Sequence, residues 1–346
     1  MDLPASARRP GAFKVLSSGD THGWHDEGPV KGPGFVVGRA TNLGRPTWSD
    51  ADYWPLNTTL YAKDFRGNDP KFAYFWFLGT DLSAFNSGSV QPMLNRNYIA
   101  NIPVNVPPLP EQRAIAATLG ALDDKIESNR RAAELARDLL DAMADEAAAR
   151  LSTVPLRAIA SLKKETVKPE LMGSTVVAHY SLPAFDDGER PERTHASTIK
   201  SNKLLVRGRA ILLSRLNPRT YRSWWVDCDD SVPSIASTEF AVLQAEGAGG
   251  LPGVWLAIRE SNFRQELARR VTGTSGSHQR VRPEDMLDIM VPDTRQLSIA
   301  ELQRTESVLS RTEAHRDESQ RLAALRDTLL PELLSGRTRL PVADGP

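Results

Sequence analysis

The feature that most constrains this chain is a long run without proline, from Glu111 to Arg150, in which apolar residues recur at alternating spacings of three and four. This spacing is the heptad pattern of a helix that packs against another helix. At about 1.5 Å per residue, the run predicts a helix of roughly 60 Å. Its length, and a polar Asn129 within the stripe, favour a coiled-coil partner over a single core helix. The recurring positions are Leu119, Leu122, Ile126, Asn129, Ala133, Ala136, Leu140 and Met143.

A second helical run extends from Gln296 to Leu334 and is less regular, because its middle, from Glu313 to Gln320, is very polar. Pro331 and Gly336 are expected to mark its end. Its apolar face is expected to consist of Ile299, Leu302, Leu309, Leu322, Leu325 and Leu329.

Outside these two runs the helical spacing disappears. Gly, Pro, Asn and Asp surround short, mostly apolar runs at 35–37, 59–62, 210–213 and 240–243. We interpret these runs as strands of mixed α/β domains.

The chain also repeats itself in a fixed order. Gly88-Ser89-Val90-Gln91-Pro92 resembles Gly276-Ser277-His278-Gln279-Arg280. Ten or so residues later, Ile102-Pro103-Val104 resembles Ile289-Met290-Val291, and each helical run follows in turn. The shared order indicates duplication of a unit made of one domain and one helix.

Charge is distributed unevenly along the chain. The 43 Lys and Arg residues balance 43 Asp and Glu residues, so bulk charge does not indicate a nucleic-acid binder. Between 189 and 225, however, nine basic residues accompany only two acids. This stretch is interpreted either as a solvated face or as a surface for phosphates.

No catalytic constellation is found. Cys228 is the single cysteine, which excludes an internal disulfide and fits a reducing compartment. The sequence contains no phosphate-binding glycine loop and no zinc spacing. Two weaker metal alternatives are His22 and His25 with nearby aspartates, and Asp227 with Asp229 and Asp230, which are interpreted as a loop and a turn. The N-terminus does not resemble a signal peptide and no run is long enough to cross a membrane, so a cytoplasmic location is expected.

Two stretches resemble the shared regions of one family. Residues 107–115, Pro-Pro-Leu-Pro-Glu-Gln-Arg-Ala-Ile, followed by Leu122-Asp123-Asp124-Lys125-Ile126 and Asn129, look like the central shared region of Type I restriction-modification specificity subunits. Residues 325–336, Leu-Arg-Asp-Thr-Leu-Leu-Pro-Glu-Leu-Leu-Ser-Gly, are similar to their C-terminal shared region. The resemblance covers nearly the whole chain, and residues 36–39, 57–61, 237–240 and 272–277 resemble the recognition-domain signatures.

The resemblance implies an α+β fold with two mixed α/β target-recognition domains, each followed by a long helix. The expected segments are a first recognition domain at 1–106, a central helix at 107–151, a second recognition domain at 152–293 and a distal helix at 294–340. The helices would pair as an antiparallel coiled coil. The pairing residues would be Leu119, Leu122, Ile126, Asn129, Leu140 and Met143 with Leu302, Leu309, Leu322, Leu325 and Leu329.

The resemblance also implies a non-catalytic subunit that reads double-stranded DNA at a bipartite target. Its expected partners are methyltransferase subunits and motor-nuclease (restriction) subunits. S-adenosylmethionine, ATP and Mg²⁺ would belong to those partners, so no cofactor or metal is expected in this chain. The alternatives from other classes are a coiled-coil scaffold without DNA readout and a nuclease in its own right.

Within each domain, Lys and Arg are expected to contact phosphates, and forked or hydroxyl side chains to contact base edges. The candidates in the first domain are Arg39, Thr41, Asn42, Arg45, Gln91, Asn95 and Arg96. The candidates in the second domain are Lys200, Lys203, Arg215, Asn217, Arg219, Arg222, Ser275, His278, Gln279 and Arg280.

The first recognition domain is expected to be shortened at its N-terminal end. Up to the aligned glycines Gly34 and Gly208, it has 34 residues, whereas the second domain, counted from Ser152, has 57. An opening strand is therefore expected to be missing.

Overall fold

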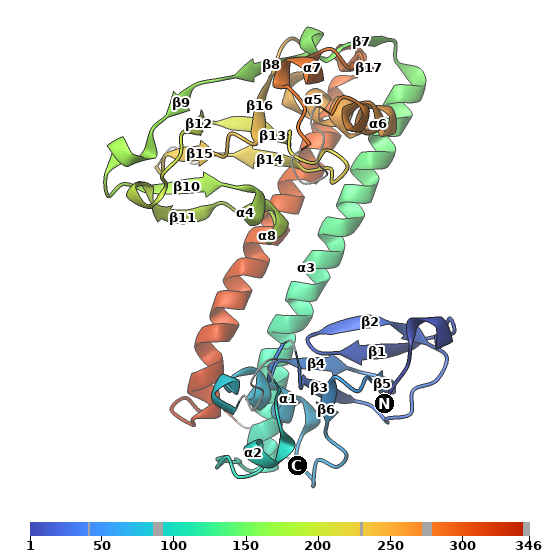
Figure 1. The fold of residues 1–346 in the computed structure, drawn as a ribbon, viewed down its shortest axis with the longest axis vertical. Helices are drawn as coiled ribbons and strands as arrows, with labels where there is room; N and C mark the ends of the chain where they lie inside the picture. Colours follow the sequence, from blue (N-terminus) through green and yellow to red (C-terminus); the bar gives the residue numbers. More distant parts are fainter. Residues whose placement is uncertain (41, 86–92, 229–230, 272–278, 342–346) are drawn as a thin grey trace. The chain divides into compact units, whose positions relative to one another are not determined.

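Two long helices pair in opposite directions in the computed structural model, which describes residues 1–40, 42–85, 93–228, 231–271 and 279–341 (Figure 1). Helix α3 spans Leu109–Arg150 and helix α8 spans Ile299–Leu334, so both long helices predicted from the sequence are confirmed. Asp123 of α3 pairs with Arg326 of α8, whereas Arg150 pairs with Glu301. Residue numbers therefore increase along α3 in the direction in which they decrease along α8, as in an antiparallel helix pair.

The buried stripe of α8 differs from the expected one over its second half. The expected Leu325 is 47 % exposed, and the neighbouring seam position is taken by Arg326, whose Nη1 donates to Asp123 at 2.8 Å. Leu325 was therefore wrongly placed in the seam, since an arginine can lie in a helix seam when a carboxylate of the other helix pairs with it. The buried positions of α8 that follow spacings of three and four are Thr305, Leu309, Thr312, Leu330 and Leu333.

The seam of α3 follows the predicted heptad more closely. Leu119 and Leu140 are buried, as is the polar Asn129, whose Nδ2 donates to Glu318 of α8 at 2.8 Å. Leu122, Ile126 and Met143 are half-buried. In α8, Leu309 is buried, whereas Leu302, Leu322 and Leu329 are half-buried.

α8 ends at Leu334, between Pro331 and Gly336, as the sequence predicts. The helix continues to Leu334 with Pro331 inside it, and Gly336 follows in the left-handed region with φ 73°. The proline removes one N–H, but Leu330 and Leu333 on either side are buried and hold the last turn against its neighbours.

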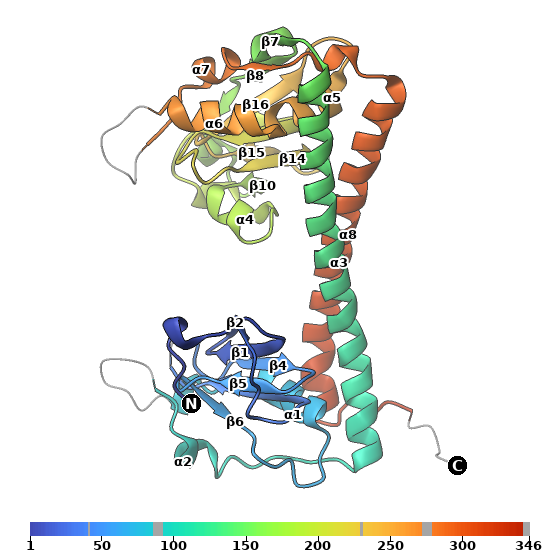
Figure 2. The ribbon, with the colours of Figure 1, turned by 90° about the vertical axis from the view of Figure 1, so that its right-hand side faces the viewer.

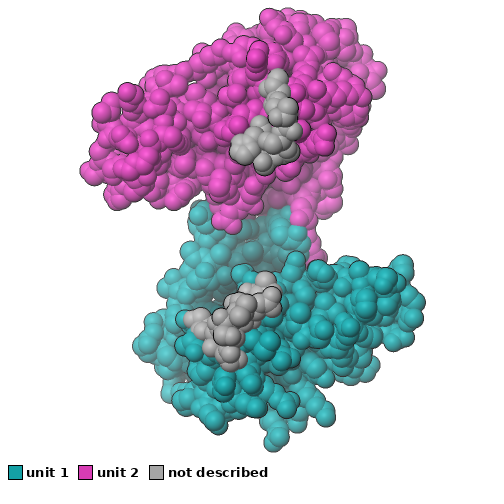
Figure 3. Space-filling model, in the orientation of Figure 1, with its two compact units in different colours: residues 1–130, 317–346 teal, residues 131–316 magenta. Residues whose placement is uncertain are grey.

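The chain divides into two compact units, shown in different colours in Figure 3. Unit 1 comprises Met1–Arg130 and Asp317–Pro346, and unit 2 comprises Arg131–Arg316. Each unit therefore holds one mixed α/β domain together with parts of both long helices, and no unit consists of helix alone.

Unit 2 contains two sheets that follow the expected mixed α/β character. A four-stranded sheet has the order β14-β13-β16-β8, and a five-stranded sheet has the order β11-β10-β15-β12-β9. A further pair joins β17 to β7. The strands are β7 (Thr153–Pro155), β8 (Ala160–Lys163), β9 (Thr166–Val167), β10 (Val176–Tyr180), β11 (Glu192–His195), β12 (Lys203–Val206), β13 (Arg209–Ser214), β14 (Ser223–Asp227), β15 (Ser234–Ala236), β16 (Phe240–Ala245) and β17 (Met290–Pro292). The short helices are α4 (Leu182–Asp186), α5 (Gly250–Arg259), α6 (Ser261–Arg269) and α7 (Pro283–Leu287).

Unit 1 repeats the same plan with fewer strands (Figure 2). Its two sheets have the orders β4-β3-β6 and β2-β1-β5. The strands are β1 (Phe13–Ser17), β2 (Asp20–His25), β3 (Gly34–Gly38), β4 (Pro46–Ser49), β5 (Tyr53–Pro55) and β6 (Thr59–Tyr61). The helices are α1 (Pro70–Leu78) and α2 (Arg96–Ile99). The expected strands at 35–37, 59–62, 210–213 and 240–243 thus correspond to β3, β6, β13 and β16.

The two domains have matching strand pairings. β3 is flanked by β4 and β6, as β13 is flanked by β14 and β16, and all four pairings are antiparallel. β1 pairs antiparallel with β2 and parallel with β5, as β10 pairs with β11 and β15. Among the described residues of unit 1, β6 has no second neighbour, whereas β16 has β8.

Separate apolar clusters anchor each unit to the long helices. In unit 1, Phe72 and Phe75 of α1 pack with Leu119 of α3 and Leu330 of α8. In unit 2, Leu140 of α3 belongs to a larger cluster that includes the sheet and α5. No described helix is both long enough and apolar enough to cross a membrane.

Candidate nucleic-acid interface

An arginine stands directly after the central strand of each domain. Arg39 follows β3, and its N–H donates to the carbonyl of Thr58 at 2.9 Å. Arg215 follows β13, and its N–H donates to the carbonyl of Glu239 at 2.9 Å. The two arginines are therefore equivalent positions of the internal repeat.

The chain returns to both arginines in the same way. After the Gly-Ser-x-Gln stretch of each domain, Leu94 donates its N–H to the carbonyl of Arg39 at 2.8 Å, and Val281 donates to that of Arg215 at 2.9 Å. Isolated bridges join Ala40 to Met93 and Leu216 to Arg280. The described residues that follow each Gly-Ser-x-Gln stretch are thus hydrogen-bonded beside equivalent arginines, whereas most residues of the stretches lie outside the described part.

A groove accompanies each arginine. Beside Arg39 lies a groove of about 280 Å³, and beside Arg215 lies one of about 370 Å³. Each groove borders the first residue of the short helix that follows the returning stretch, Arg96 of α2 and Pro283 of α7. The first groove is lined by Arg39, Leu60, Met93, Leu94, Asn95 and Arg96.

Cations predominate among the charged groups of the second groove. Lys163, Lys164, Arg215 and Arg282 line it together with Glu284. Lys164 pairs with Glu284 at 2.5 Å and lowers the pKa of that carboxyl. The buried Nε of Arg215 has no hydrogen-bond partner among the described residues. This groove therefore offers positive charge to an anionic ligand.

Sequence reasoning missed three of these cations. Lys163 and Lys164 come from the end of β8 and Arg282 precedes α7, so they lie far in sequence from the basic stretch. Only the pairing of β8 with β16 brings the two lysines to the groove. The sequence shows Lys163 and Lys164 next to each other, but no neighbouring pattern in the sequence indicated that they line this groove.

Three of the nine cations in the basic stretch around 190–222 pair with carboxylates of unit 2. Arg222 forms two hydrogen bonds to Asp186 at 2.7 and 2.9 Å, and Arg207 and Arg209 pair with Glu165 and Asp227. A cation that already holds a carboxylate has less to gain from a phosphate.

Lys203 also departs from its expected role. It is 7 % exposed, and its Nζ donates to the hydroxyl of Ser201 at 2.5 Å. Burial lowers the pKa of this amine. Lys200 remains exposed, with its Nζ 2.9 Å from the carbonyl of Ser197.

Two other candidates are engaged within the protein. Arg280 donates from Nε and Nη2 to Glu239 at 2.9 and 2.8 Å, and this interaction lowers the pKa of Glu239. Asn95 caps α2, because its side chain accepts from the N–H of Asn97 at 3.0 Å. Both residues therefore have structural roles beside the grooves.

The remaining candidates occupy varied positions. Asn42 donates from Nδ2 to the carbonyl of Ser18, and Arg45 and Arg219 are exposed. Asn217 has φ 46°, and its N–H donates to the carbonyl of Gln279 at 2.8 Å. Thr41, Gln91, Ser275 and His278 lie outside the described residues.

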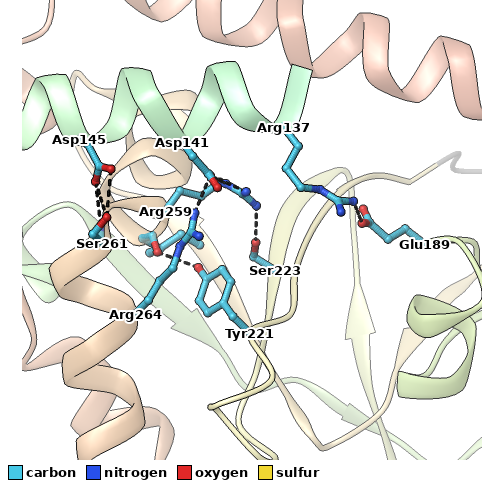
Figure 4. Close-up of polar contacts among 10 residues, drawn as sticks. Arg137, Asp141, Asp145, Glu189, Tyr221, Ser223, Arg259, Ser261 and Arg264 are labelled. Atoms are coloured by element: carbon cyan, nitrogen blue, oxygen red, sulfur yellow. Dashed lines mark hydrogen bonds and ion pairs between the residues drawn. The ribbon is translucent and has the colours of Figure 1, made fainter. Parts of the chain in front are cut away.

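The second domain is fixed to α3 by a ladder of polar contacts (Figure 4). Asp141 accepts from Arg259 and pairs with Arg264, both at 2.5 Å, and one turn later Asp145 accepts from Ser261 at 2.9 Å. Arg259 is 6 % exposed. Two acids of the helical run, Asp141 and Asp145, thus bind the second domain.

Glu189 extends this ladder to the second helix. It accepts from Arg137 of α3 and Arg316 of α8, each at 2.6 Å, with φ 58° at its own backbone. Arg316 is largely buried, and desolvation lowers its pKa. One carboxylate of the domain therefore holds both helices within unit 2.

The histidines near the N-terminus do not form a metal site. His25 is buried, accepts the N–H of Arg9 at Nδ1 and meets Trp54 edge to face, whereas Asp26 pairs with Arg9. Within the described residues, no three His, Cys, Asp or Glu side chains come together as metal ligands.

Comparison with known proteins agrees with this duplicated architecture. Residues 30–137 match the family model of the Type I restriction modification DNA specificity domain. This stretch therefore resembles the DNA specificity domains of that family. A search of curated protein sequences finds no match.

A similarity of fold to solved structures covers nearly the whole chain. The S subunit of a Type I restriction-modification system from M. genitalium is similar, with a TM-score of 0.64 and 17 % identity over 96 % of this chain and 91 % of that one. The HsdS subunit from Thermoanaerobacter tengcongensis matches with 14 % identity over 89 % and 82 % of the two chains, at a TM-score of 0.32. At these identities the likeness concerns the fold, and the first match carries it.

Proposed function

We propose that this chain is the sequence-specific DNA-binding subunit that directs methyltransferase and restriction subunits to a bipartite DNA target. The observation that carries the proposal is the duplicated interface, with an equivalent arginine, returning stretch and groove in each domain. The match of residues 30–137 to a DNA specificity domain supports DNA as the ligand. Two copies of one interface predict two short recognised sequences separated by an unread spacer.

The grooves suggest which residues of the second domain contact phosphates and which contact bases. Lys163 and Lys200 would contact phosphates, which sets register and salt dependence without carrying sequence information. Arg215 and Gln279 would present forked side chains to base edges in the major groove. Arg280 would act indirectly, through its ion pair with Glu239 at the base of the returning stretch.

The chemistry would belong to partner subunits. In this proposal the chain itself neither methylates nor cleaves DNA, and S-adenosylmethionine, ATP and Mg²⁺ are used by the methyltransferase and restriction subunits. The complex would act in the cytoplasm.

The decisive experiment is methylation sequencing of DNA from cells that express the chain with its neighbouring methyltransferase. We expect one bipartite methylated motif that disappears when this chain is omitted. A motif that persists without the chain would contradict the proposal.

The purified chain provides a second test through its salt dependence. We expect its binding to duplex DNA to fall steeply with salt, because phosphate contacts release counterions. Failure to bind duplex would favour the scaffold alternative, and magnesium-dependent cleavage by the chain alone would favour the nuclease.

A further inference from the structure

An exposed arginine, Arg282, borders the groove of the second domain. It lines this groove together with Arg215 and Lys163. The one acid among the lining residues, Glu284, is paired with Lys164 at 2.5 Å. Within the described part of the chain, the guanidinium of Arg282 has no hydrogen bond and no ion pair. Its donors are therefore available to a ligand in the groove.

The backbone at Arg282 is fixed on both sides. Val281 is 0 % exposed, and its N–H donates to the carbonyl of Arg215 at 2.9 Å. Pro283 begins α7 and favours an extended conformation in the residue before it, and Arg282 has φ −71° and ψ 134°. Met286 of α7 is also buried. The starting point of the arginine side chain is thus set before a ligand binds, and such preorganisation favours specific contacts.

The equivalent position of the first domain has a different side chain. Leu94 is the counterpart of Val281, because each donates its N–H to the carbonyl of the arginine after the central strand. The next residues, Asn95 and Arg282, are therefore equivalent, and each is the N-cap of a short helix. Asn95 caps α2 through its side-chain oxygen, whereas arginine has no acceptor and makes no side-chain cap at α7. Arg282 thus occupies a capping position without serving the helix.

We propose that Arg282 is a specificity-determining residue that binds one guanine of the half-site read by the second domain. This inference rests on the proposed DNA readout. The planar guanidinium presents two N–H groups in a fork that matches O6 and N7 of guanine in the major groove. Lys163 ends in a compact charge on a flexible stem, which suits a phosphate. Arg282 and Lys163 therefore have different tasks in one groove.

The first test uses cells that express the chain with its neighbouring methyltransferase. Arg282→Ala should make one guanine position of the methylated motif degenerate, in one half-site only, because the contact that selects this base is lost. Arg207→Ala is the matched control. Arg207 is also exposed, but it lies outside the residues that line the groove and pairs with Glu165 at 3.1 Å. The control should leave the motif unchanged.

The second test removes a single acceptor from the DNA. 7-Deazaguanine pairs as guanine does but lacks N7. In duplexes that carry the methylated motif, guanines are replaced one at a time, and one replacement should weaken binding of the wild-type chain roughly fivefold or more. The Arg282→Ala variant should bind this duplex and the unmodified duplex equally, because the interaction with N7 is already absent.

Three results would overturn this inference and leave the proposed function intact. The first is an Arg282→Ala variant that keeps the wild-type motif, and the second is a second half-site without guanine. The third is an equal loss on every duplex, which would make Arg282 a phosphate contact. Circular dichroism establishes that each variant is folded. A wild-type chain that gives no bipartite motif would instead contradict the proposed function itself.

Discussion

Asp141→Ala is expected to weaken the attachment of the second recognition domain to α3. Asp141 receives two arginines at 2.5 Å, and one of them, Arg259, is 6 % exposed. Without the carboxylate, Arg259 retains only its 3.2 Å hydrogen bond to Ser223 and its position 5.3 Å from the ring centroid of Trp255 among the contacts described here. The variant therefore leaves a buried cation nearly uncompensated.

The expected loss of stability follows from how exposed Asp141 and Arg259 are. Removing one partner of a buried ion pair costs about 3–5 kcal/mol. The side chain of Asp141 is 29 % exposed, so solvent screening places the expected loss at the lower end, about 3 kcal/mol. With a urea m-value of about 2–3 kcal/mol/M, the midpoint of unit 2 should fall by about 1–1.5 M.

Tryptophan fluorescence during urea unfolding is a suitable measurement, because Trp225 and Trp255 meet in unit 2 at a centroid distance of 6.0 Å. Asp138→Ala on the same helix is the control, since Asp138 is exposed, and it should change the midpoint little. Equal midpoints for the Asp141→Ala and Asp138→Ala variants would refute the reasoning that the ladder in Figure 4 holds the domain.

Three further predictions concern the seam, the start of α8 and the interface. Leu119→Ala should destabilise unit 1 by about 2–5 kcal/mol in chemical denaturation, and Leu135→Ala, at 69 % exposure, should not. Ser298 holds the pKa of Glu301 at about 2, below its ordinary 4.5, so this carboxylate stabilises the protein above pH 4.5 and loses that effect as the pH falls towards 2. Glu301→Gln should flatten this part of the pH profile of thermal unfolding, and an unchanged profile would contradict the assignment. Arg215→Ala should cost about 1–3 kcal/mol on the half-site read by the second domain and little on the other, measured with duplexes altered in one half-site at a time. A uniform loss on every duplex would make Arg215 a phosphate contact.

The long helices and the duplication could be predicted from the sequence, because the helices have a heptad spacing and the duplication repeats motifs in a fixed order. The heptad of α3 correctly places Leu119, Asn129 and Leu140 in the buried stripe. The strands β3, β6, β13 and β16 follow from short apolar runs between turn residues.

The tertiary structure alone decided which polar side chains are engaged. Charge in sequence does not show where a carboxylate will lie after folding, and Arg222, Lys203 and Arg280 each acquire an internal partner from a distant or adjacent segment. For the same reason, the leucine spacing wrongly predicted Leu325 in the seam. Arg326 lies there instead, because it pairs with Asp123 of α3.

The grooves, and the residues that line them, also come from the tertiary structure. Lys163 reaches the groove of Arg215 only because β8 pairs with β16, and Arg282 borders it only because Val281 donates its N–H to the carbonyl of Arg215. Periodicity is a local property that a sequence carries by itself. Pairing between segments distant in sequence is decided by the burial and hydrogen bonds of the assembled sheet.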